Sequence, residues 1–154
     1  MSNLFRLDLS EKLGGDPRSD VAKSIEKILF ACRNHPIYQV DLSNNDMYDD
    51  GMKHIFEFLK VNTTINTLIM NNCGLGVKSP AFLGMALLVN PKLKLRRLFL
   101  DNNNIHDLGL KQLGLFLSKM GSIEELSVSN NVKDKSIVSD EGISWLVDNI
   151  CKCV

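Results

Sequence analysis

One spacing of apolar residues returns four times along the chain. In each copy, an apolar residue is followed three positions later by a second, and a third comes two positions after that. An Asn or Cys then stands three positions beyond the third apolar residue. The copies begin at Ile37, Ile65, Leu95 and Ile123, so the period is 28 to 30 residues. Apolar residues two apart share one face of an extended chain, so the pattern predicts strands at 38–42, 66–70, 96–100 and 124–128.

Each predicted strand is followed by apolar residues spaced three and four positions apart, which mark a stripe along a helix. The predicted helices cover about 50–60, 79–88, 107–119 and 140–150. A worn copy of the strand pattern opens the chain at Leu4, Leu7 and Leu9, and a helical stripe follows it at Val21, Ile25, Ile28 and Leu29. A strand and a helix in every unit predict an α/β fold with parallel strands in sequence order. Within it, we expect Leu42, Leu68, Met70, Leu98, Leu100 and Leu126 to be buried.

The strand pattern is similar to the leucine-rich repeat phrase, L-x-x-L-x-L-x-x-N/C-x-L. A helix in every unit and a period near 29 residues resemble the ribonuclease-inhibitor class of these repeats. The resemblance implies a solenoid, a right-handed β-α superhelix with parallel strands on the concave face and helices on the convex face. We expect one domain, 1–154, divided into a degenerate capping unit at 1–36, regular repeats at 37–64, 65–94 and 95–122, and a last repeat at 123–154.

The Asn or Cys of each copy falls where the chain leaves the strand. A buried Asn there can serve main-chain groups of the turn and of the next unit, which predicts this role for Asn45, Asn103 and Asn131, with Cys73 as a smaller variant. The last unit departs from the pattern, because Lys133 stands where an apolar residue is expected. We interpret 132–138 as an inserted loop, either a tolerated surface insertion or a loop that reaches the binding face.

Composition and charge restrict the function. The chain has 154 residues, a formal net charge of zero and 44% hydrophobic residues, which fits one domain with a sizeable core. Zero net charge argues against nucleic acid as the main partner, and no apolar run approaches the length of a membrane span. The N-terminus does not read as a signal peptide, so we expect a cytoplasmic protein, monomeric and with reduced thiols.

Candidate chemistry is sparse. Four cysteines form no C-x-x-C pair, and Cys151 and Cys153 offer only a weak metal or redox pattern. The three histidines are scattered over different units. We therefore predict no metal site, no cofactor and no catalytic residue of the chain's own.

The residues between the apolar strand positions should face the concave side. Its central column reads Asp8, Asp41, Ile69, Phe99 and Ser127. Ile69 and Phe99 would form an exposed apolar pair beside Arg96, Arg97 and Asp101, either as an anchor for a partner or as lateral packing between strands. The residues predicted to contact a partner protein are Ile69, Asn72, Arg97, Phe99, Asp101, Glu125 and Ser127.

One segment resembles a particular family. Asn71-Asn72-Cys73-Gly74-Leu75-Gly76 is similar to the N-N-C-G-[LM]-G segment of Ran GTPase-activating proteins, and Ile123-Glu124-Glu125-Leu126 and Glu141-Gly142-Ile143 follow in the family's order. The resemblance covers roughly 37 to 146. It implies that Asn72 orders a catalytic glutamine of a small GTPase. Asp101-Asn102-Asn103-Asn104-Ile105 stands where the family has G-R-N-R-L, so both arginines of that stretch are missing.

Three hypotheses for function follow. The first is a module that binds another protein through its concave face, and the alternative is a GTPase activator of the Ran type, whole or degenerate. A third is a capping or scaffold module, because tropomodulin-like proteins also use these repeats.

Overall fold

The computed structural model describes residues 4–13, 20–119, 121–131 and 141–150. Five strands form one parallel sheet in the order β1-β2-β3-β4-β5, as the sequence pattern predicts. The strands are β1 (Phe5–Asp8), β2 (Ile37–Asp41), β3 (Thr67–Ile69), β4 (Arg97–Phe99) and β5 (Glu125–Ser127).

The last three strands are shorter than predicted, but their main-chain bonding continues past their ends. Met70 N–H donates to Phe99 O at 2.9 Å, and Asn72 N–H donates to Asp101 O at 2.8 Å. Equivalent bonds join the other neighbouring units, so the turns after the strands are tied together as closely as the strands.

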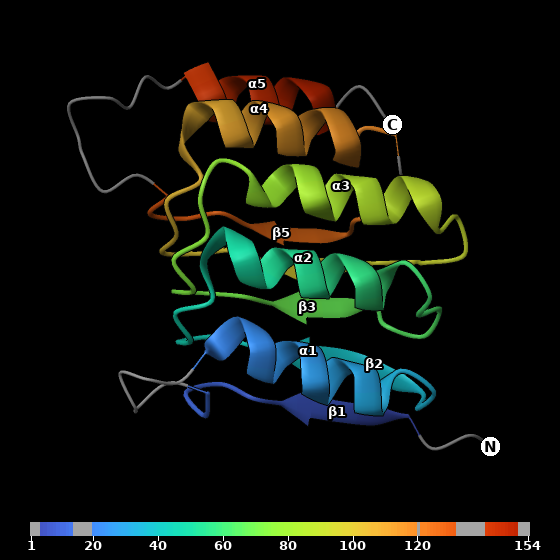
Figure 1. Cartoon of the computed structure of the whole chain (residues 1–154). Helices are drawn as coiled ribbons and strands as arrows, with labels where there is room; N and C mark the ends of the chain where they lie inside the picture. Colours follow the sequence, from blue (N-terminus) through green and yellow to red (C-terminus); the bar gives the residue numbers. More distant parts are fainter. Residues whose placement is uncertain (1–3, 14–19, 120, 132–140, 151–154) are drawn as a thin grey trace.

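Helices cover one face of the sheet. They are α1 (Val21–Cys32), α2 (Tyr48–Leu59), α3 (Ser79–Val89), α4 (His106–Leu117) and α5 (Glu141–Ile150). Figure 1 shows them stacked in chain order in a single layer, each beside the helices of the neighbouring units. The α/β architecture of repeated strand–helix units is therefore confirmed.

Adjacent helices lie close enough that small residues are needed between them. The Phe116 ring of α4 lies over Gly84 of α3, where an added Cβ would come within 2.0 Å of the ring.

The core lies between the sheet and the helix layer. Leu42, Leu68, Met70, Leu98 and Leu100 are 0–2% exposed, as predicted. Leu126 is the exception, since it is only half-buried and packs against the edge of the core. Its strand β5 is the last of the sheet, so among the described strands it has a neighbour on one side only.

Buried amides tie each unit to the one before it. Asn103 Nδ2 donates to Leu100 O and to Met70 O of the preceding unit, both at 2.8 Å, and its Oδ1 accepts from Cys73 N–H at 2.9 Å and Leu75 N–H at 3.1 Å. Asn45 and Asn131 make the same two kinds of carbonyl contact. The repeat asparagines are 1–3% exposed and bond to the turn, as predicted. The prediction named the wrong neighbour, because their other bonds go to the preceding unit and not to the next one.

Cys73 takes the same place in its unit with fewer bonds. Its thiol donates to Leu42 O at 3.2 Å, the equivalent carbonyl of the preceding unit. Burial raises the pKa of this thiol to about 12, so it stays protonated at neutral pH. The predicted inserted loop at 132–138 lies outside the described residues, as do Cys151 and Cys153.

Truncation of Leu98 tests the core. Leu98 is 0% exposed in the middle strands of the sheet, so Leu98→Ala should lower the free energy of unfolding by roughly 2–5 kcal/mol. Denaturant titration measures this change. Leu88→Ala, at a position 54% exposed on α3, is the matched control and should change it by less than about 0.5 kcal/mol. Equal effects of the two substitutions would contradict the core assignment.

Truncation of Asn103 tests the buried amides. Asn103→Ala leaves main-chain groups of two units without a partner and should lower the free energy of unfolding by about 1–3 kcal/mol. The exposed Asn34 offers a control, since Asn34→Ala should be close to neutral in the same titration. An unchanged midpoint for Asn103→Ala would show that water replaces the amide at no cost.

Candidate functional site

The face of the sheet opposite the helices is the first candidate surface, here called the open face. Within the described part of the chain, no helix or strand covers it (Figure 1). Parallel register places Asp41, Ile69, Phe99 and Ser127 side by side across it. The predicted central column is therefore present, and its middle is apolar.

Ile69 and Phe99 are direct neighbours in this column. Both are half-buried, whereas the sequence predicted an exposed pair. The difference arises because side chains in register on adjacent strands shield one another. Lateral packing therefore buries part of each side chain, and the rest of each side chain stays open to solvent.

Polar side chains beside the apolar pair are held in place. Arg97 Nε donates to Thr67 Oγ1 at 3.0 Å, and Thr67 is only 2% exposed beneath it. Asp101 Oδ1 accepts from Ser127 Oγ at 2.6 Å and from Ser129 N–H at 2.7 Å. Arg97 and Asp101 are thus oriented before any partner arrives, which lowers the entropy cost of binding.

Other charges near the pair are freer. Arg96 pairs with Glu124 at 3.1 Å, but both side chains are about 60% exposed, so solvent weakens the pair. Glu125 is exposed and lies opposite Arg97 in the sheet register. Glu125 thus adds a charge on the β5 side of the apolar pair.

Charges dominate the β1 and β2 end of the open face. Arg6 lies 3.2 Å from Asp8 and 3.8 Å from Asp41. Hydrogen bonds from the Ser10 hydroxyl and main chain lower the pKa of Asp8, so its carboxylate is charged at neutral pH. The open face therefore changes from charged at β1 to apolar at β3 and β4.

A row of exposed side chains borders the open face where the chain leaves the strands. Every member has a positive φ, between 52° and 60°, a conformation that Asn adopts more readily than most residues. Asn72 Nδ2 donates to Asn44 Oδ1 at 3.0 Å, and Asn130 donates to Asn102 in the same way. The row consists of Glu11, Asn44, Asn72, Asn102 and Asn130.

Asn72 is exposed, as predicted. Its backbone angle and its side-chain bond recur in the neighbouring units, so its geometry belongs to the repeat. Asn44 and Asn102 share its positive φ, although Asn102 accepts an amide bond from Asn130 where Asn72 donates one to Asn44.

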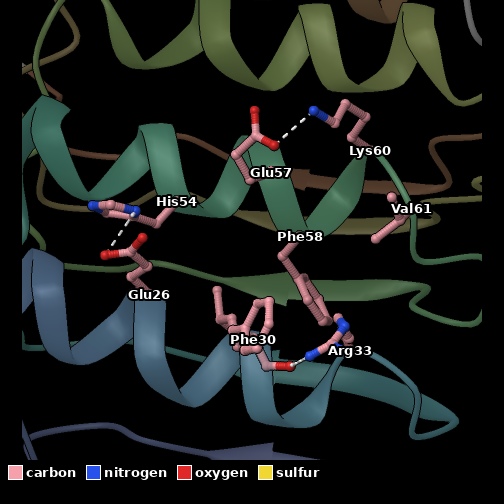
Figure 2. Close-up of a pocket in the computed structure, with 9 residues that line it drawn as sticks. Glu26, Phe30, Arg33, His54, Glu57, Phe58, Lys60 and Val61 are labelled. Atoms are coloured by element: carbon pink, nitrogen blue, oxygen red, sulfur yellow. Dashed lines mark hydrogen bonds and ion pairs between the residues drawn. The ribbon is translucent and has the colours of Figure 1, made fainter.

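A second candidate surface lies on the helix side, between α1 and α2 (Figure 2). This groove has a volume of about 450 Å3. Phe30 is 63% exposed at one side, with the Arg33 guanidinium 3.8 Å from its ring centre, and Glu57 and Lys60 are 2.6 Å apart at the other. The lining residues are Glu26, Leu29, Phe30, Arg33, His54, Glu57, Phe58, Lys60 and Val61.

The sequence reasoning missed this groove. Phe30 lies outside the apolar stripe of its helix, which is formed by Val21, Ile25 and Leu29. A large apolar residue off the stripe was the available signal.

Two features of the described residues bear on metal and membrane binding. Within them, no three His, Cys, Asp or Glu side chains are grouped so that they could hold a metal ion. Of the helices described, none has the length and apolar character needed to cross a membrane.

Fold and surface together define an α/β protein of repeated strand–helix units, with one parallel sheet and one open sheet face. Neither a family model nor a curated protein matches the sequence. Among solved structures, a tropomodulin C-terminal domain from Caenorhabditis elegans is similar, with a TM-score of 0.73, 13% identity, and coverage of 99% of this chain and 85% of that one. Leiomodin-1 actin-binding site 2 is similar with a TM-score of 0.68, 14% identity, and coverage of 96% and 80%. At these identities the likeness shows the fold alone.

Proposed function

We propose that this chain is a protein-interaction module that binds another protein through its open face. The observation that carries the proposal is the in-register pair Ile69 and Phe99, which lies partly open to solvent between oriented polar side chains. A small apolar centre with a polar border is the usual anatomy of a binding site for protein. Arg97, Asp101, Glu125 and Ser127 form the border, and Asn72 lies at the rim.

We infer further that the chain is a leucine-rich repeat solenoid of the ribonuclease-inhibitor class, with the open face concave. The constant period, the helix in every unit and the parallel strand order support this finer assignment. A concave face lets several strands contact one partner at once, so a partner would touch side chains from β2 to β5 together.

Actin is the first partner to test. The leiomodin-1 domain of similar fold is described as an actin-binding site, and the present chain covers 80% of it. A capping or scaffold role in the cytoplasm would fit such a partner. The proposal gives the chain no catalytic step and no cofactor.

Charge substitutions in the apolar pair test the proposal. Ile69→Asp or Phe99→Asp would bury an unpaired carboxylate in the contact and should weaken partner binding by more than about tenfold. Sedimentation with purified actin is the first measurement, followed by titration with a protein captured from a cytosolic extract if actin does not bind. Leu108→Asp, at a position 59% exposed on α4, is the matched control.

Two outcomes would contradict the open face as the binding site. Binding that survives both strand substitutions but is lost in Phe30→Asp would transfer the site to the helix-side groove. Binding that Leu108→Asp removes equally would show a general effect of added charge.

The second candidate is a GTPase activator of the Ran type. The observation in its favour is the exposed Asn72 within the Asn71–Gly76 segment. Against it stands the recurrence of the same positive φ at Asn44 and Asn102, together with the arginines missing from 101–105.

A hydrolysis assay separates the two functions. We expect no acceleration of GTP hydrolysis by purified Ran at any concentration of this chain, because the family's two arginines are absent. Should acceleration occur, Asn72→Ala and Asn102→Ala form a matched pair, since both remove an amide at a positive φ. Activity lost only in Asn72→Ala would make the GTPase function the leading one.

A further inference from the structure

The outer edge of β1 exposes apolar positions that are covered in the other units. Phe5 is 52% exposed, although Ile37, with which it pairs at a register irregularity, is 3% exposed. Leu7 is half-buried, and its partner Val40 is 1% exposed. The difference arises because β1 covers β2, whereas no described residue pairs with the far side of β1.

Main-chain groups on this edge are also open. Phe5 N–H donates to Pro36 O at 3.0 Å and Leu9 N–H donates to Asp41 O at 2.8 Å, so the odd-numbered residues bond to β2. Main-chain groups alternate in direction along a strand, so Arg6 and Asp8 direct theirs to the outer edge. An open edge of this kind is a template for one more strand.

The side chains of this edge match a second copy of themselves. When two such strands run antiparallel about a two-fold axis at Leu7, Arg6 of each copy lies opposite Asp8 of the other. Leu7 meets Leu7, and Phe5 meets Leu9, so the apolar side chains extend the core side of both sheets. We propose that two copies of this chain pair through the outer edges of β1 and form a continuous ten-stranded sheet.

The hydrogen-bond pattern requires the same register. In an antiparallel pair, directly opposite residues alternate between those that exchange both main-chain bonds and those that exchange none. The outward groups of Arg6 and Asp8 place them in the bonded pairs, and Leu7 then lies in the unbonded pair on the axis. Charge, apolar side chains and main-chain direction therefore select one arrangement, with self-complementary surfaces as a two-fold dimer needs.

A dimer departs from the monomer expected from the sequence. The strand is only 4 residues long, so the dimer should be populated at high protein concentration, in roughly the 10–100 μM range. This contact uses Arg6 and Asp8 at the β1 end of the open face, and it does not include Ile69, Phe99 or the helix-side groove.

Cross-linking tests the register directly. Unbonded antiparallel pairs bring Cα atoms to about 4.5 Å, within the range of a disulfide, so Leu7→Cys should join two copies under mild oxidation. Both cysteine variants are made in a background with Cys32→Ser, Cys151→Ser and Cys153→Ser. This background keeps Cys73, which is fully buried. Leu4→Cys is the matched control, because its two copies would lie about 20 Å apart across the axis and should not join.

Charge reversal tests the pairing in solution. Arg6→Asp or Asp8→Arg places like charges opposite each other twice and should weaken dimerisation by about tenfold in sedimentation equilibrium. The double variant Arg6→Asp with Asp8→Arg restores opposite charges and should recover most of the affinity. Thermal unfolding at low concentration checks that β1 keeps its place, since Arg6 also lies 3.8 Å from Asp41.

Three results would overturn the proposal. The first is a wild-type chain that remains monomeric at its highest soluble concentration. The second is a dimer that both single reversals leave unchanged. The third is a Leu7→Cys variant that forms the intermolecular disulfide no faster than the Leu4→Cys variant. This comparison remains decisive even if the charge variants fold poorly.

Discussion

Lateral contact between neighbouring units is the interaction on which the rest of this structure depends. A strand of three residues with one inward apolar side chain cannot bury it alone, and a single helix over it cannot do so either. Only a neighbouring unit in register completes the cover. Leu98 is fully buried because β3 and β5 flank its strand, whereas Leu126 and Leu7, with one described neighbour each, are only half-buried.

Register also organises the surfaces. From β2 onward, each unit repeats its neighbour with a shift of one strand spacing, so residues 28 or 30 apart in sequence become direct neighbours. Ile69 and Phe99 meet for this reason, and so do the exposed side chains of Asn44 and Asn72. The same rule leaves β1 with an open edge, so the interaction that builds the sheet also provides the surface for pairing with a second copy.

Much of the fold could be predicted because one residue pattern serves both local and lateral structure. The spacing that marks a strand also fixes its parallel neighbour, and the buried role of Asn103 follows from its place at the strand end. Exposure was harder to predict, because it depends on what lies beside a residue. Leu126 is half-buried because only one described strand flanks β5, and Phe99 is half-buried because Ile69 lies beside it.

The candidate site was predicted in part. The sequence placed the central column on the open face and named its apolar pair, since alternation along a strand assigns faces. It gave no sign of the bonds that orient Arg97 and Asp101, because those join residues 26 to 30 apart through side-chain geometry. The groove at Phe30 was not predicted because it forms between two helices, whereas the spacing of apolar residues describes one helix at a time.

Cys73 has a consequence for how this protein can be observed. Its thiol is enclosed by two units and its pKa is raised to about 12, so alkylating reagents react with it only when those units separate. The native chain thus contains a buried thiol whose rate of alkylation reports the opening of the sheet. The rate at which this thiol is modified measures how often β2 and β3 part, in a molecule that needs no added probe.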